Sequence, residues 1–211
     1  MLTVRFLDRH DAGQRLAAAL SALAPEDPVI LALPRGGVPV AYEIARTLSA
    51  PLDILAVRKL GAPGNPEFGV GAIAEGDVVV VREEVARRVG LVGAALEEAL
   101  RRERVELDRR VERYRGERAT VPLAGCSAVL VDDGVATGLS EIAAVRAARV
   151  RGAARVIVAV PVGARDSIRL LRSEADEVVC LIEARQLIGV GRWYDDFRAV
   201  SDEEVVALLA N

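Results

Sequence analysis

Residues 129–140 read VLVDDGVATGLS and join an apolar run to a turn and then to the start of a helix. An apolar run of this kind is typical of a buried strand, and Asp132 and Asp133 follow it directly. The glycines and hydroxyl residues of the turn can cradle a phosphate, because the first N–H groups of a helix are free to bind an anion. The order of strand, turn and helix indicates an α/β protein.

Similar apolar runs, rich in Val and Ile, recur along the whole chain. Ala-rich segments with helical spacing lie between several of them, at 38–48, 140–149 and 166–172. This alternation is expected of crossover units around a parallel sheet flanked by helices, so we predict one domain over residues 1–211. The runs are PVILAL (28–33), PLDILAV (51–57), DVVVV (77–81), SAVLV (127–131), ARVIVAV (154–160) and DEVVCLI (176–182).

Residues 82–118 have a different pattern, which predicts a long charged helix with an interruption near Gly90 and Gly93. Arg and Glu alternate along it, which favours a helix packed on the sheet or on a second subunit over a basic arm for nucleic acid. Further on, Ser201 and Glu204 predict a capped helix at the C-terminus. The apolar face of the long helix comprises Leu96, Leu100, Leu107, Val111 and Tyr114.

The composition excludes several classes of ligand. A formal net charge of −3 gives no basic field for nucleic acid, and no apolar run approaches the ~20 residues of a membrane span. We expect a cytoplasmic protein with no membrane partner. Cys126 and Cys180 are expected to be buried thiols, and with His10 they cannot form a zinc site, whereas magnesium bound by carboxylates and substrate phosphates is compatible with the sequence.

Two other loops also follow apolar runs, where ligands bind at the carboxyl ends of parallel strands. The first, LPRGG at 33–37, can bind an anion, although an ordinary turn has the same composition. The second begins with Arg58 and Lys59 and continues into the Gly- and Pro-rich residues 60–76, which fit a mobile lid or a solvated surface loop. For 132–140 the alternative is an Asp-rich turn capped by Ser140, which leaves the paired charges unexplained.

Together the three loops resemble the type I phosphoribosyltransferases. The signature of that family has two acidic residues, a variable pair, ATG or DTG and a hydroxyl residue, as in VDDGVATG at 131–138. LPRGGVPVA at 33–41 lies where the family has its pyrophosphate loop, and VRKLGAPGNPEFGVGA at 57–72 resembles the catalytic loop of the adenine and orotate enzymes. The three segments also resemble a bacterial subgroup with no assigned acceptor. The resemblance covers about residues 29–162, with 82–118 as an enlargement.

The resemblance implies a reaction in which a nitrogen heterocycle displaces pyrophosphate from 5-phosphoribosyl-1-pyrophosphate (PRPP), with Mg²⁺ as cofactor in a homodimer. Asp132 and Asp133 would bind the ribose hydroxyls and, through these or water, the metal. Arg35, Arg58 and Lys59 would stabilise the leaving group, and Glu67 would accept a proton from the incoming base. The pyrophosphate would contact Pro34, Arg35, Gly36 and Gly37 across a cis Pro34–Arg35 peptide, and the 5'-phosphate would contact Gly134, Val135, Ala136, Thr137, Gly138, Leu139 and Ser140.

Two features of the sequence point to different acceptors. Ala136 stands where hypoxanthine and guanine enzymes have a third Asp, which favours the adenine, uracil and orotate pattern. Residues 183–211 would form a hood, and within it 187–198 resemble the hood segment of the hypoxanthine-guanine enzymes, yet Pro161 replaces the Lys that those enzymes have after the preceding strand. The hood would contact the base through Ile188, Val190, Trp193 and Tyr194. The aromatic residues Trp193, Tyr194 and Phe197 also fit local core packing.

Three hypotheses for function follow from these observations. The first is a magnesium-dependent phosphoribosyltransferase, and the second is a non-catalytic protein of the same fold that binds PRPP and regulates a partner. Arg35, Arg58 and Lys59 favour the enzyme, because a sensor of the ribose and 5'-phosphate has no need of leaving-group residues. A generic phosphate-binding domain is disfavoured by the spacing of DDGVATG.

Overall fold

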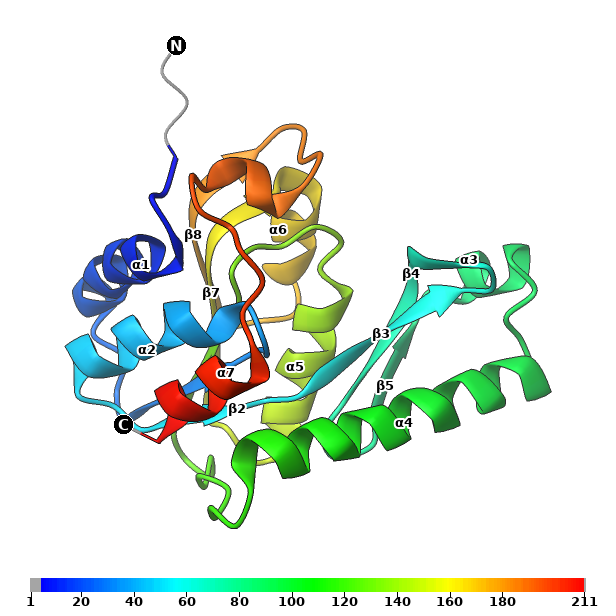
Figure 1. Cartoon of the computed structure of the whole chain (residues 1–211), viewed down its shortest axis with the longest axis horizontal. Coiled ribbons are helices and arrows are strands. Elements are labelled where there is room, and N and C mark those ends of the chain that lie inside the picture. The colour runs from blue at the N-terminus through cyan, green and yellow to red at the C-terminus, as the bar shows by residue number, and fades with distance from the viewer. Residues whose placement is uncertain (1–4, 211) are drawn as a thin grey trace.

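The computed structural model of the chain describes residues 5–210, without the side chain of Glu67. Five strands form a parallel sheet in the order β2-β1-β6-β7-β8 (Figure 1). The order reverses between β1 and β6, which creates the kind of crevice where ligands bind in open α/β sheets. The strands are β1 (Pro28–Ala32), β2 (Leu52–Ile54), β6 (Ser127–Val131), β7 (Arg155–Ala164) and β8 (Glu177–Ala184).

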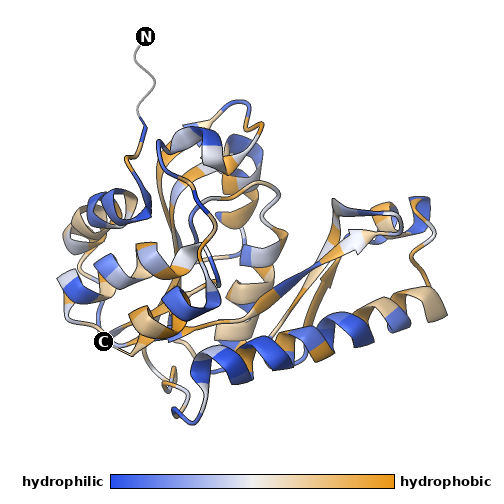
Figure 2. Cartoon of the chain, in the orientation of Figure 1, coloured by the Kyte–Doolittle hydropathy of each residue, from blue (hydrophilic) through white to orange (hydrophobic). Residues whose placement is uncertain are grey.

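Helices cover both faces of this sheet, as the alternation of apolar runs and helical segments predicts. Successive side chains of a strand point to opposite faces. Val129 and Val131 accordingly pack on one side with α1 (Arg9–Leu23), α2 (Gly37–Leu48) and α7 (Asp202–Leu209). Leu130 packs on the other side with α5 (Leu139–Val150) and α6 (Arg165–Leu171). Apolar colour accordingly runs through the strands and the inner sides of the helices (Figure 2).

A side lobe, residues 57–115, projects from one end of the sheet (Figure 1). It contains the antiparallel strands β3 (Val57–Ala62), β4 (Asn65–Ala74) and β5 (Val78–Val81), followed by α3 (Glu83–Arg88) and α4 (Ala94–Arg115). The run DVVVV therefore pairs in this second sheet and not in the parallel one. The expectation of a loop over residues 60–76 is also wrong, because most of them form β3 and β4 with a register shift at Gly61.

The interruption of the charged helix near Gly90 and Gly93 is confirmed, since both glycines have positive φ and separate α3 from α4. The predicted apolar face of α4 packs on the side lobe through Leu107, while Tyr114 reaches the main core. The Tyr114 hydroxyl donates to Asp202 Oδ1 at 2.6 Å, which joins α4 to α7. The predicted cap is confirmed as well, because Ser201 accepts a hydrogen bond from the Glu204 amide.

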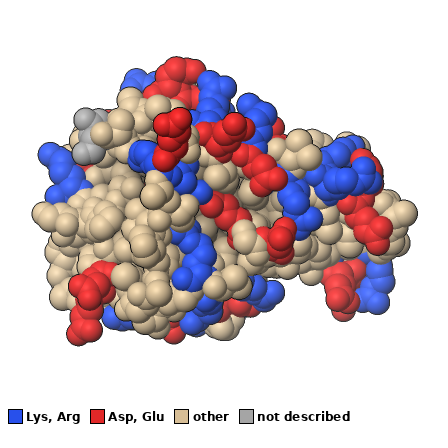
Figure 3. All heavy atoms as spheres, turned by 90° about the horizontal axis from the view of Figure 1, so that it is seen from below, with Lys and Arg blue, Asp and Glu red and all other residues tan. Residues whose placement is uncertain are grey.

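The surface carries both signs of charge. Lys and Arg are interspersed with Asp and Glu over the lower face of the molecule (Figure 3). Across residues 5–210, every helix is too short or too polar to cross a membrane. Cys126 and Cys180 are free thiols, but each is only half-buried and not fully buried as expected. Burial nevertheless raises the pKa of Cys180 to about 11.

A buried ionic network fixes the C-terminal end of α4 to the rest of the protein. The Arg115 side chain is 8% exposed and lies between Asp53 of β2, at 3.2 Å, and Glu75, at 2.8 Å. It also donates to the Ile54 carbonyl at 2.9 Å. One guanidinium thus joins the main sheet to the turn after β4, and removing it leaves two carboxylates without their shared cation.

We therefore expect Arg115→Gln to lower the free energy of unfolding by about 3 kcal/mol, because breaking a buried ion pair leaves uncompensated charge. Arg102→Gln serves as control, since the Arg102 side chain is 72% exposed and 4.0 Å from Glu98. That control is expected to change stability by less than about 0.5 kcal/mol. Urea denaturation followed by circular dichroism measures both, and equal losses would contradict the role given to the network.

Candidate functional site

A cavity of about 450 Å³ opens at the carboxyl ends of β1 and β6, where the strand order reverses. Loops 33–37 and 132–141 form its floor, and β3 and α4 of the side lobe form the opposite wall. All three segments predicted from the sequence thus contribute to one site, although the third consists of strands β3 and β4 and not of a loop. Residues lining it are Leu33, Pro34, Val57, Arg58, Lys59, Gly61, Pro66, Glu103, Arg110, Asp132, Asp133, Gly134, Ala136, Thr137, Ser140, Glu141 and Val190.

The loop after β6 is held in place by its neighbours. Val135 donates to the Val162 carbonyl and accepts from the Ala164 amide, both at 2.9 Å, so the loop extends the parallel pairing with β7. Ser167 of α6 donates to the Ala136 carbonyl at 2.6 Å. Gly138 then turns the chain with a φ of 80° into α5. Because the first N–H groups of a helix have no partner within it, this fixed turn is suited to bind a phosphate.

The loop after β1 packs directly against the loop after β6. The predicted cis peptide between Pro34 and Arg35 is confirmed. A Cβ on Gly36 would lie 2.0 Å from Asp133 Oδ2, and one on Gly37 would lie 2.4 Å from the Val131 carbonyl oxygen. The two glycines are therefore needed for the contact between the loops, in addition to any contact with an anion.

Arg9 of α1 holds Asp133 in place, although its sequence context does not predict this role. Its Nε lies 2.9 Å from Asp133 Oδ2, and the two side chains are 10% and 15% exposed. It also donates to the Arg198 carbonyl at 2.8 Å, and its guanidinium lies 3.9 Å from the centre of the Phe197 ring. In the sequence Arg9 is one charge among several before a helix, so no local signal distinguishes it.

Three carboxyl groups share the floor of the cavity. Burial raises the pKa of Asp132 well above its usual range, and the negative charges of Asp133 and Glu141 raise it further. Burial also raises the pKa of Asp133, although Arg9 opposes the shift, and raises that of Glu141. Glu141 was missed because it reads as an ordinary acidic residue in the first turn of a helix. A ligand or ion with positive charge is favoured beside these groups.

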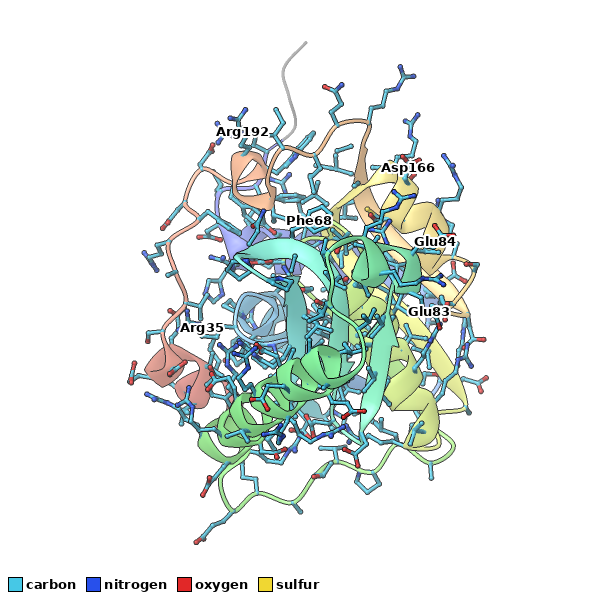
Figure 4. The ribbon with its side chains drawn as sticks, turned by 90° about the vertical axis from the view of Figure 1, so that its right-hand side faces the viewer. Arg35, Phe68, Glu83, Glu84, Asp166 and Arg192 are labelled. Carbon is cyan, nitrogen blue, oxygen red and sulfur yellow. The ribbon has the colours of Figure 1, made fainter. Side chains whose placement is uncertain are left out.

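The predicted cations occupy different positions. Arg58 and Lys59 of β3 line the cavity, and Arg58 is paired with Glu103 of α4 at 2.8 Å. Among the described residues, Arg35 does not line the cavity. It extends toward α7, where its guanidinium lies 3.4 Å from the Asp202 carboxylate (Figure 4). Glu103 and Arg110 were missed, because α4 has many charges and its sequence does not show which of them face the cavity.

The predicted acceptor residues are dispersed. Val190, at the start of the 3₁₀-helix η1 (Val190–Trp193), lines the cavity, whereas Ile188 is 76% exposed. Tyr194 is buried against Phe6, with Trp193 packed beside them, as expected for local core. The Tyr194 hydroxyl donates to the Asp133 carbonyl at 2.6 Å, so this residue supports the floor.

Glu67, the predicted proton acceptor, lies within β4, but its side chain falls outside the described residues. Among the side chains that the structure describes, no three or more from His, Cys, Asp and Glu are arranged to hold a metal ion.

The raised pKa of Asp132 generates a prediction for stability. The folded protein favours the protonated carboxyl, so stability is lost as the pH rises through the folded-state pKa. The Asp132→Asn variant has no such loss. We therefore expect its melting temperature to exceed that of the wild-type protein by about 3 °C at pH 8 and by less at pH 5. Asp108→Asn, at an exposed carboxyl, should shift neither value. A gain for Asp132→Asn that is the same at both pH values would contradict the prediction.

Sequence comparisons agree with the resemblance of the loops. A family model described as the phosphoribosyl transferase domain matches residues 7–195. The Mycobacterium tuberculosis H37Rv protein "Putative phosphoribosyl transferase Rv0571c" is 48% identical over 204 residues, covering 97% of this chain and 46% of that protein. A relative from strain CDC 1551 gives the same values. The chain thus spans about half the length of the curated relatives it matches.

Solved structures give the same result. The protein TT1426 from Thermus thermophilus is 47% identical, and the match covers 97% of both chains with a TM-score of 0.82. The purine phosphoribosyltransferase from Pyrococcus horikoshii is 16% identical over 90% of both chains, with a TM-score of 0.50, and at this identity shows the fold alone. With a family match across most of its length and these relatives, the chain belongs to the phosphoribosyl transferase domain family.

Proposed function

We propose that this domain transfers the 5-phosphoribosyl group from PRPP to a nitrogen heterocycle and releases pyrophosphate. The observation that carries the proposal is the convergence of the three predicted segments on one cavity at the reversal of strand order. Membership of the family supports it. A cavity with a phosphate-binding helix start, paired carboxylates and a cationic wall matches the chemical groups of PRPP.

On this proposal, the floor of the cavity positions the donor. The N-terminus of α5 and the hydroxyls of Thr137 and Ser140 bind the 5'-phosphate. Asp132 and Asp133 accept hydrogen bonds from the ribose hydroxyls. Arg9 donates to one oxygen of Asp133 and fixes the orientation of the carboxylate. The fixed orientation reduces the entropy lost on binding.

The opposite wall stabilises the leaving group. Arg58 and Lys59 neutralise negative charge as pyrophosphate departs, and Arg35 joins them by leaving its exposed pair with Asp202. Oxygen donors on the floor suit Mg²⁺, which Asp132 and Asp133 would hold through ribose hydroxyls or water. The ion, when bound, supplies further neutralisation of the phosphate charge.

The acceptor would enter beside Val190, the one predicted acceptor residue that lines the cavity within the described part of the chain. Ala136 places no carboxylate next to the base, so the site does not select a purine through a third Asp. The described lining residues do not favour one base over another, so we propose only that the acceptor is a nitrogen heterocycle.

A second candidate is a PRPP-binding regulatory protein of the same fold. It is favoured by the engagement of two leaving-group cations, because Arg58 is paired with Glu103 and Arg35 with Asp202. A regulator would keep these pairs when the donor binds, whereas an enzyme would break them.

One assay separates the two candidates. Pyrophosphate release from PRPP with Mg²⁺ is measured against adenine, hypoxanthine, guanine, xanthine, uracil and orotate. We expect release with at least one base, and tight PRPP binding without release for any base would favour the regulator.

The double variant Asp132→Asn with Asp133→Asn should abolish PRPP binding, while its circular dichroism spectrum stays that of the folded protein. Unchanged PRPP affinity in that double variant would refute the site.

A further inference from the structure

Helix α4 forms part of the cavity wall, although its sequence gives no motif for binding. Glu103 and Arg110 are about two helical turns apart and therefore lie on one face. Leu107 lies between them and is buried against Ala56 and Ile73. This apolar contact fixes the rotation of α4, so that both charged side chains reach the cavity.

Arg110 is oriented by a single contact. Its Nε lies 3.0 Å from Glu106 Oε1, and its side chain is 26% exposed. Its two terminal nitrogens make no hydrogen bond within residues 5–210. Glu106 also pairs with Arg109 at 2.8 Å, and the hydrogen bonds from Arg109 and Arg110 lower its pKa to about 2. Glu106 is therefore charged at any working pH and holds Arg110 with its terminal nitrogens unused.

Arg110 belongs to a group of cations from separate elements. Arg110 of α4 lines the cavity. Arg58 and Lys59 of β3 line the same cavity. A guanidinium with free terminal N–H groups can make paired hydrogen bonds to phosphate oxygens, which suits a diphosphate better than a single point charge does.

Glu103 opposes this group of cations. Its Oε2 accepts from Arg58 Nε at 2.9 Å and lies 2.8 Å from a terminal nitrogen of the same guanidinium. A phosphate group entering the cavity would compete with the Glu103 carboxylate for Arg58. It would also be repelled by the Glu103 charge.

We propose that Arg110 is a further binding residue for the pyrophosphate group of the donor, and that Glu103 competes with pyrophosphate for Arg58. This inference rests on the proposed function. Residues 82–118, which contain α4, then bind the ligand in addition to packing on the rest of the lobe.

The test compares Arg110→Gln with Arg109→Gln by calorimetry, using PRPP, inorganic pyrophosphate and ribose 5-phosphate, each with Mg²⁺. The two substitutions remove one partner each from Glu106, but Arg109 is outside the cavity lining in the described chain. We expect Arg110→Gln to weaken PRPP and pyrophosphate about tenfold, the loss typical of one hydrogen bond to a charged group. Ribose 5-phosphate has no pyrophosphate, so its affinity should stay unchanged, and Arg109→Gln should leave all three affinities near wild type.

Two further variants and a matched control keep the test independent of folding. Arg110→Lys retains the charge and should recover part of the affinity for pyrophosphate. Glu103→Gln should strengthen pyrophosphate binding severalfold, whereas Glu98→Gln, which affects an exposed carboxylate on the same helix, should not.

Equal weakening by the Arg109 and Arg110 variants, or loss of ribose 5-phosphate affinity along with PRPP, would overturn the role of Arg110. Unchanged or weaker pyrophosphate binding by Glu103→Gln would overturn the competition for Arg58. Both results leave the proposed function standing if the wild type binds PRPP. A wild type that binds neither PRPP nor pyrophosphate refutes the proposed function as well.

Discussion

The position of the Asp133 carboxylate is the constraint on which the site depends. Arg9 of α1 pairs with it, Gly36 leaves room for it, and the Tyr194 hydroxyl holds its backbone carbonyl. Helix α1, the loop after β1 and the residue that follows η1 thus all meet at Asp133. Because each contact comes from a different element, the carboxylate is placed only when these separate parts of the chain pack together.

Charge on the floor of the cavity opposes folding. Burial raises the pKa values of Asp132, Asp133 and Glu141, so the ionised forms that a ribose or a metal ion requires are the costly ones. Lys59 and Arg9 offset part of the cost, and a cationic or hydroxyl-rich ligand would offset more. A protein selected only for stability would replace such groups, which is why their presence supports a binding role.

The sequence predicted the parts of the fold that depend on local patterns. Apolar runs and helical segments predicted the parallel sheet, and glycine-containing turns predicted the loops after β1 and β6, whereas the Gly- and Pro-rich residues 60–76 proved to be mostly strand. The strand β5 was misplaced because VVVV has the same pattern in a parallel or an antiparallel sheet. Arg9 and Arg110 were missed for another reason, since an Arg among other charges on a helix shows its role only when tertiary packing selects the face it lies on. The opposite error concerns Tyr194, which was predicted to contact the base but is buried in the core against Phe6.

The anchoring of α4 explains how a projecting lobe can contribute to a precise site. Arg115, which joins α4 to Asp53 and Glu75, lies five residues after Arg110, or about 7.5 Å along the helix. The rigid end of the helix is therefore the end nearest the cavity residue, and Tyr114 adds a second attachment to α7. The far end of α4 packs on the small core of the side lobe. Because Arg110 lies near this anchored end, the main sheet fixes its place in the cavity wall, whereas Arg58 and Lys59 are held in the same wall by the pairing of β3 with β4.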